Sequence, residues 1–209
     1  MTRAPPWPER LQALRYDADA AAAYAPAYEH IAREVGLERG AFLDVGCGPG
    51  WLAIAVAGGK PELDAVGIDR SAAMLRVAER NKGFRLNVTF REMSASRIVF
   101  PDRTFDGVAV VHAREVWSDA PAVLEEIFRV LVPGGRALVY EPDPDGEIPD
   151  GWIRRRGGWP PDALLRRTWR RTALDRDQWT ALKSAVKASP FGGGVDGRHG
   201  WYRRLVLEA

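Results

Sequence analysis

Short apolar runs alternate with helix-like segments through the middle of the chain. Phe42–Val45 and Leu63–Asp69 have the composition of buried strands, and each run carries an acid at or near its end. Gly107–Val111 is almost continuously apolar, which is typical of a central parallel strand covered on both faces. Ser71–Ala78 and Ala120–Val132 lie after such runs and show helical spacing. The alternation predicts an α/β fold with a parallel, doubly wound sheet.

Further segments extend this pattern toward both ends. The sequence predicts helices at Trp51–Ala57 and Asp175–Ser189, and strands at Leu86–Arg91, Arg136–Glu141 and Trp201–Leu207. Near the N-terminus, Tyr24, Tyr28 and Ile31 fall at i, i+4 and i+7, which predicts a helix broken or begun near Pro26. Residues 1–9 are proline-rich and are predicted to be a loose arm.

The composition narrows the class of protein. With 209 residues and 46% hydrophobic residues, the chain fits one folded domain. No apolar run approaches the roughly 20 residues of a membrane span, and the start lacks the apolar core of a signal peptide. A lone Cys47 excludes an internal disulfide or a cysteine-based zinc cluster. We therefore expect a cytoplasmic protein without a metal site or membrane segment.

A glycine-rich loop, Gly46–Gly50, follows the first strand. Glycine allows a sharp bend and a close backbone approach to a ligand, and Pro49 stiffens the turn. The loop lacks the Lys-Ser/Thr of a phosphate-binding P-loop and the spacing of a dinucleotide fingerprint. Asp44, just ahead of the glycines, suits a cationic ligand better than a pyrophosphate. The simpler alternative is a tight turn that binds nothing.

The stretch from Phe42 to Gly50 resembles motif I of the class I S-adenosylmethionine-dependent methyltransferases, close to those of ubiquinone and menaquinone biosynthesis. Asp69 ends the second strand 25 positions after Asp44, near the ~20-residue interval at which nucleotide-binding βαβ units place a ribose-binding carboxylate. Phe128–Gly135 is similar to the family phrase Arg-Val-Leu-x-Pro-Gly-Gly. The resemblance covers roughly residues 41–142, and it implies S-adenosylmethionine as cofactor.

The resemblance also implies a seven-stranded, Rossmann-like sheet, mostly parallel with an antiparallel C-terminal strand and helices on both faces. One departure concerns Ser94, which stands where relatives carry an Asp that holds the adenine amino group. The implied parts of the single domain are an N-terminal helical lid (1–38), core βαβ units (41–141), a substrate-facing insertion (142–174), and the last helix and closing strands (175–209). The implied cofactor-binding residues are Tyr16, Tyr24, Asp44, Gly46, Cys47, Gly48, Pro49, Gly50, Asp69, Arg70, Met74, Ser94, Ala95, Val111 and His112.

Charge is distributed unevenly along the chain. Residues 1–150 carry 17 Lys/Arg against 23 Asp/Glu, whereas residues 151–209 carry 13 against 5. The insertion concentrates arginine and tryptophan, and a solvated helix face would explain this composition. Recognition of a small anionic acceptor is the sharper hypothesis, because arginine grips carboxylates and phosphates in a fork. Its candidate substrate-binding residues are Trp117, Trp152, Arg154, Arg155 and Arg156. Nucleic acid is a poorer match because the rest of the chain is acidic.

Methyl transfer always needs the two reactants to be aligned. It needs a general base only when the acceptor must lose a proton. His112 follows the fourth strand, where ligands meet such sheets, and Glu115 is a second candidate base. The leading hypothesis is a methyltransferase acting on a small-molecule acceptor, as a monomer or homodimer. A catalytically silent S-adenosylmethionine-binding regulator or partner protein is the alternative. The glycine spacing disfavours a nicotinamide-dependent dehydrogenase.

Overall fold

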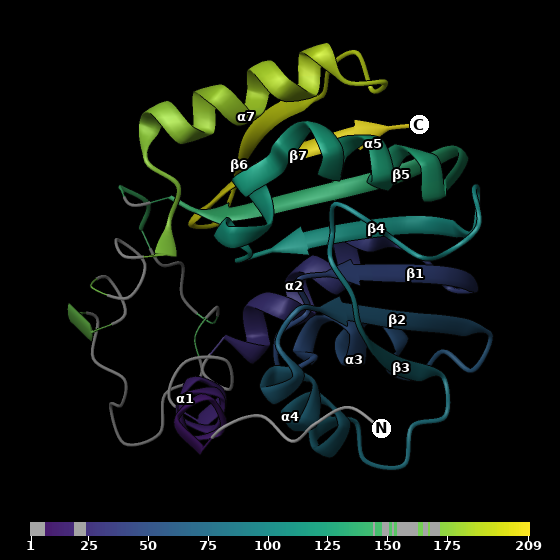
Figure 1. The fold of residues 1–209 in the computed structure, drawn as a ribbon, viewed down its shortest axis with the longest axis vertical. Coiled ribbons are helices and arrows are strands. Elements are labelled where there is room, and N and C mark those ends of the chain that lie inside the picture. Colours follow the sequence, from purple (N-terminus) through teal and green to yellow (C-terminus); the bar gives the residue numbers. More distant parts are fainter. Residues whose placement is uncertain are drawn as a thin grey trace.

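The computed structural model describes residues 7–18, 24–143, 145–147, 151, 153, 163–164, 167 and 172–209. Its centre is one seven-stranded sheet with the order β3-β2-β1-β4-β5-β7-β6 (Figure 1). The strands are β1 (Gly40–Val45), β2 (Leu63–Asp69), β3 (Val88–Glu92), β4 (Phe105–Val111), β5 (Leu131–Pro142), β6 (Val195–His199) and β7 (Tyr202–Glu208). β7 runs antiparallel to both β5 and β6, and the pairs from β3 to β5 are parallel. The predicted fold class is confirmed.

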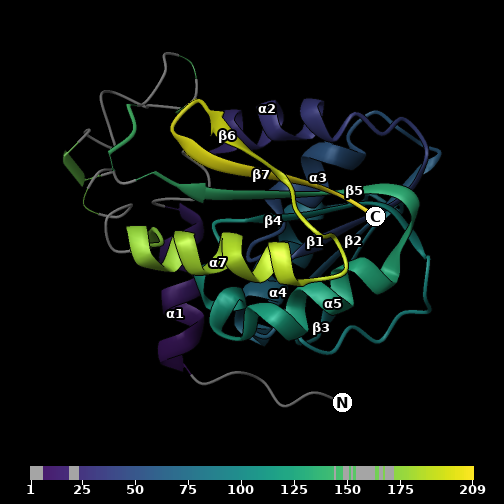
Figure 2. The ribbon, with the colours of Figure 1, turned by 90° about the horizontal axis from the view of Figure 1, so that it is seen from above.

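Helices cover both faces of the sheet (Figure 2). On one side, Phe42 of β1 packs with apolar side chains of α2 (Ala25–Val35) and α3 (Trp51–Ala57). On the other, Leu43 and Val45 pack with α5 (Ala120–Val130) and α7 (Arg176–Ala188). Alternate residues of one strand thus enter two different cores, because successive side chains point to opposite faces. This explains why the central strands are apolar at nearly every position.

The N-terminal region forms two helices. α1 spans Trp7–Tyr16 and packs against α4 (Ala72–Lys82), beyond the strand ends in Figure 1. The expectation of a loose arm was therefore wrong for residues 7–9. α2 has Pro26 in its first turn, where a missing N–H is tolerated. The predicted helix start near Pro26 is confirmed.

The structure differs from the predictions at the junction of α5 and β5 and at β6. α5 ends at Val130, and β5 already begins at Leu131 and continues through Pro133-Gly134-Gly135 to Pro142. Gly134 has φ 80° and its N–H donates to the Ala209 carbonyl at 2.7 Å, so a distant segment stabilises this stretch. β6 has no alternating apolar pattern and was not located from sequence. It forms as an edge strand because β7 supplies its hydrogen-bonding partner.

Candidate functional site

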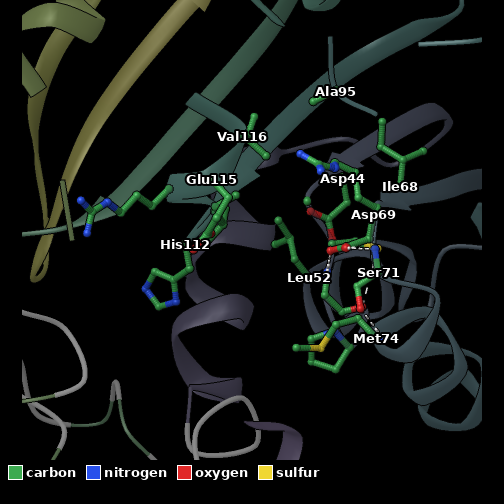
Figure 3. Close-up of a pocket in the computed structure, with 18 of the residues that line it drawn as sticks. Asp44, Leu52, Ile68, Asp69, Ser71, Met74, Ala95, His112, Glu115 and Val116 are labelled. Atoms are coloured by element: carbon green, nitrogen blue, oxygen red, sulfur yellow. Dashed lines mark hydrogen bonds between the residues drawn. The ribbon is translucent and has the colours of Figure 1, made fainter. Parts of the chain in front are cut away.

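A cavity of about 760 Å³ lies at the carboxyl ends of the central strands. It opens where the strand order reverses between β1 and β4, the position at which doubly wound sheets bind ligands. The volume is in the range of pockets that enclose a small organic ligand. Figure 3 shows Asp44 and Asp69 together on one side of the cavity, with His112 on the other.

The glycine-rich loop is fixed to β2 and exposes its backbone to the cavity. The N–H groups of Gly46 and Cys47 both donate to the Ile68 carbonyl, at 2.8 and 3.0 Å. Gly46 has φ 73°, and an added Cβ would lie 2.8 Å from the Cβ of Ala113. Gly48 has φ 51°, and an added Cβ would meet no heavy atom within 4 Å. The loop therefore leaves open space at Gly48, where a ligand can approach the backbone.

Asp69 is held rigidly beside this loop. Its Oδ2 accepts a hydrogen bond from the Gly48 N–H and its Oδ1 accepts one from the Ser71 N–H, both at 2.8 Å. Burial raises the pKa of the Asp69 carboxyl, although these bonds to the backbone oppose the shift. Each carboxylate oxygen retains capacity to accept a further hydrogen bond. The side chain is thus preorganised to bind donor groups of a ligand.

Asp44 and Cys47 lie deeper in the same wall. Asp44 is only 2% exposed, and its Oδ2 accepts from the Ala53 N–H at 3.2 Å in the first turn of α3. Burial raises the Asp44 pKa to about 7. A cationic group placed nearby would favour its ionised form. Burial also raises the Cys47 thiol pKa well above its usual value, so this thiol is a poor nucleophile.

The opposite side of the cavity is an aromatic wall, formed by Tyr16, Tyr24, Tyr28 and His112. The His112 ring lies 5.2 Å from the Tyr24 ring and 6.3 Å from the Tyr28 ring, between centroids. Its Nε2 has no hydrogen-bond partner among the described residues. Burial lowers the His112 pKa to about 3, so the imidazole is neutral at physiological pH. A group this weakly basic is better suited to hydrogen bonding than to proton abstraction.

Helix α1 covers part of the cavity and is tied to the glycine-rich loop. The Tyr16 hydroxyl at its end shares a hydrogen bond with that of Tyr28. The next residue, Asp17, accepts from Trp51 Nε1 at 2.8 Å and from Arg80 and Asn81, each at 2.9 Å. Asn81 also donates to the carbonyl of Pro49 at 3.1 Å. Asp17 therefore links the covering helix to the loop through partly buried side-chain hydrogen bonds.

Most residues predicted from sequence line the cavity, and their ligand contacts stay predictions. Those that line it are Tyr16, Tyr24, Asp44, Gly46, Cys47, Gly48, Pro49, Asp69, Arg70, Met74, Ser94, Ala95, Val111, His112 and Glu115. Gly50 does not line it: it precedes α3 as the N-cap residue, and an added Cβ would collide with the Phe90 ring. Trp117 does not either, since its buried indole donates to Glu141 Oε1 at 2.9 Å. Trp152 and Arg154, Arg155 and Arg156 lie outside the described residues.

The structure adds residues that sequence reasoning missed. Tyr28, Ser71 and Met93 also line the cavity. A signal existed for Tyr28, because it lies four positions after Tyr24 on the same helix face. Ser71 was recognised only as the helix cap, and its Oγ does accept the Met74 N–H at 3.3 Å.

Among the residues that the structure describes, no three His, Cys, Asp or Glu side chains gather closely enough to hold a metal ion. None of the helices placed there combines the length and apolarity that a membrane crossing requires.

Sequence comparison finds similarity to methyltransferases over part of the chain. Residues 42–135 match the family model described as a methyltransferase domain. The chain is 38% identical over 107 residues to demethylmenaquinone methyltransferase of Thermus thermophilus, covering 50% of this chain and 49% of that protein. It is 33% identical over 126 residues to phosphoethanolamine N-methyltransferase 3 of Arabidopsis thaliana, covering 55% of this chain and 24% of that protein. The chain thus spans about half the length, or less, of these curated relatives.

Solved structures share the fold over nearly the whole chain. A structure from Methanococcus maripaludis, assigned as an S-adenosylmethionine-dependent methyltransferase, aligns with a TM-score of 0.75 at 17% identity, covering 99% of this chain and 96% of that chain. An S-adenosylmethionine-dependent methyltransferase from Aquifex aeolicus aligns with a TM-score of 0.65 at 22% identity, covering 95% and 97%. At these identities the likeness establishes the architecture alone.

Proposed function

We propose that the chain is a class I S-adenosylmethionine-dependent methyltransferase, which transfers a methyl group from that cofactor to a small-molecule acceptor. The observation that carries the proposal is the Asp69 carboxylate, fixed by the Gly48 and Ser71 N–H groups at the mouth of the glycine-rich loop. A carboxylate with free acceptor capacity matches the paired hydroxyls of a ribose. Open space at Gly48 allows the ligand to approach that carboxylate.

The residues of the cavity fit this cofactor. Asp69 and the Gly48 backbone would hold the ribose end, and Asp44 would lie near the cationic part. Met74, Ser94 and Ala95 line the region assigned to the adenine. Ser94 is neutral where relatives have a carboxylate, yet its Oγ can still hydrogen-bond, as it does with Ser96 Oγ at 3.0 Å.

S-adenosylmethionine supplies a methyl group on a sulfonium sulfur, already reactive toward nucleophiles. The chain's own contribution is alignment and exclusion of water. Tyr16, Tyr24 and Tyr28 form an apolar surface against which a planar acceptor can pack. His112, neutral and with an unpartnered Nε2 among the described residues, can exchange a hydrogen bond with an acceptor hydroxyl or amine. Glu115, exposed at the cavity edge, is the alternative polar contact.

For the acceptor we propose an anionic small molecule recognised by the insertion 142–174. The support is its position after β5, together with its excess of arginine. Relatives are named for a demethylmenaquinone and for phosphoethanolamine, of which the second carries a phosphate. Both names are consistent with a small organic acceptor.

Two measurements test the proposal. Calorimetry should detect S-adenosylmethionine and its demethylated product, and neither should be displaced by NAD. Transfer of an isotopically labelled methyl group is then screened against matched acceptors with and without a carboxylate or phosphate. Changing Arg154, Arg155 and Arg156 together to Glu should raise the acceptor KM and spare cofactor affinity. Cofactor binding without transfer to any acceptor would favour a silent binding protein, and no cofactor binding would reject the function.

A further inference from the structure

His112 has an unusual backbone conformation for its position. It follows the last residue of β4 and has φ 54°, in the left-handed region that residues with a Cβ rarely adopt. Such conformations persist only where the surrounding structure over-determines them, and they concentrate at functional sites. The His112 N–H donates to the Tyr140 carbonyl at 3.0 Å, which fixes the residue from the β5 side. This bond fixes His112 itself but not the turn that begins at Ala113, which needs a contact of its own.

That contact comes from Glu141 of β5. Its Oε1 accepts the N–H of Ala113, the residue directly after His112, at 3.2 Å. The same oxygen accepts Trp117 Nε1 at 2.9 Å, from the 3-10 helix η2 (Arg114–Asp119). Glu141 is fully buried and does not line the cavity. One carboxyl group therefore joins the turn at His112 to the helix after it.

The same turn also packs against the glycine-rich loop. An added Cβ on Gly46 would lie 2.8 Å from Ala113 Cβ and 3.1 Å from Val116 Cγ2. Displacement of Ala113 would therefore alter both the aromatic wall and the contact with the glycine-rich loop.

We infer that Glu141 is a positioning residue, which holds His112 in its left-handed conformation against the cavity and thereby shapes the acceptor side of the site. The expected effect on acceptor turnover rests on the proposed function, whereas the positioning of His112 by Glu141 does not. Glu141 acts through its Oε1 as a hydrogen-bond acceptor and requires no negative charge to do so.

Burial and neighbouring charges support a neutral carboxyl. Glu141 Oε2 has no hydrogen-bond partner among the described residues. Burial, chiefly, and Glu115 raise the Glu141 pKa to about 8, while bonds from Trp117 and Ala113 and the charge of Arg114 oppose the shift. Tyr16 and Tyr202 also lie within electrostatic range of Glu141. At neutral pH the group is mostly protonated, so glutamine reproduces its shape and its accepting oxygen.

The experiment follows the His112 ring by NMR. The chain has three histidines, and His112→Gln assigns the resonance. In the unaltered protein the His112 ring should not titrate between about pH 5 and 8, because its pKa is lowered by burial. In Glu141→Gln the His112 ring should still not titrate in this range, and acceptor kcat/KM should stay within roughly threefold of that of the unaltered protein. Glu141→Met, which removes the acceptor oxygen, should let the ring titrate near its usual pKa of ~6.5 and lower acceptor kcat/KM by roughly tenfold or more.

Controls separate positioning from general loss of stability. Glu126→Met also removes a carboxylate that accepts a backbone N–H, that of Ile98 at 2.6 Å, but on α5 away from His112. It should leave His112 silent. If Glu141→Met does not fold, Glu141→Asp serves as the second variant. It withdraws the carboxyl group by one methylene and so tests whether the His112 ring titrates when the hydrogen bonds to Ala113 and Trp117 are lost. The inference is overturned if the ring stays silent in the folded Met or Asp variant, or if Glu141→Gln releases it equally. Absence of cofactor binding in the unaltered protein would defeat the proposed function alone, since the NMR readout is independent of it.

Discussion

Replacing Asp69 removes a cavity side chain that accepts one backbone N–H from the glycine-rich loop, at Gly48, and one from Ser71 at the start of α4. Both bonds measure 2.8 Å, within the range of charge-assisted contacts. A hydrogen bond to a charged group contributes about 1.5–3 kcal/mol. Loss of the ribose contact in Asp69→Ala should therefore weaken S-adenosylmethionine binding by roughly 10- to 150-fold.

Asp69→Asn sharpens the interpretation. The amide oxygen can accept one of the two N–H bonds, but the amide nitrogen would then face the second N–H donor. Asparagine should therefore restore less than half of the lost binding free energy. Asp64→Ala is the matched control, because Asp64 lies on the same strand but is exposed and does not line the cavity. It should bind the cofactor normally.

Because burial raises the pKa of the Asp69 carboxyl, calorimetry is done at about pH 8, where the ionised form is favoured more than at neutral pH. The assay uses the cofactor product and its analogue without the ribose 2′-hydroxyl. The unaltered protein should prefer the complete ribose, and Asp69→Ala should bind the two ligands almost equally. Unchanged affinity in Asp69→Ala, or a preserved preference for the hydroxyl, would refute the assignment.

Three other changes test the geometry. Gly48→Ala should lower the free energy of unfolding by only the ~1–2 kcal/mol that a left-handed conformation costs a residue with a Cβ. Gly46→Ala should lower it further, because the added methyl group would lie 2.8 Å from the Ala113 Cβ. Equal losses of stability on denaturant unfolding would contradict this. Asp17→Ala should release α1 and weaken cofactor binding by roughly tenfold, and an unchanged dissociation rate would argue against a covering role. Asp44 and Glu141, with pKa values raised by burial to about 7 and about 8, keep protons that the unfolded chain loses near pH ~4. The stability they contribute is full below that pH and is lost as pH rises toward and through the folded values. The melting temperature of the cofactor-free protein should therefore fall between about pH 4 and 8, and a flat or rising profile would disprove this.

The sequence by itself determined the order of the elements and predicted the class of ligand. The continuous apolar character of Gly107–Val111 predicted a strand buried on both faces, and β4 is such a strand. Glycine spacing and the acid at the end of the second strand identified the loop and the carboxylate that lie together at the cavity. These features are local, because strand composition, glycine conformations and chain order are all visible in a short window of residues.

The tertiary structure decided the features that depend on distant partners. β6 has no pattern of its own and forms only because β7 pairs with it. Trp117 looked like a cavity residue from its position after β4, yet the buried carboxyl of Glu141 turns its indole inward. His112 was a candidate base, but it packs among the Tyr24, Tyr28, Trp201 and Tyr202 rings, and burial lowers its pKa so that it is neutral. Packing between segments far apart in the chain sets the burial of a group, and burial sets its charge.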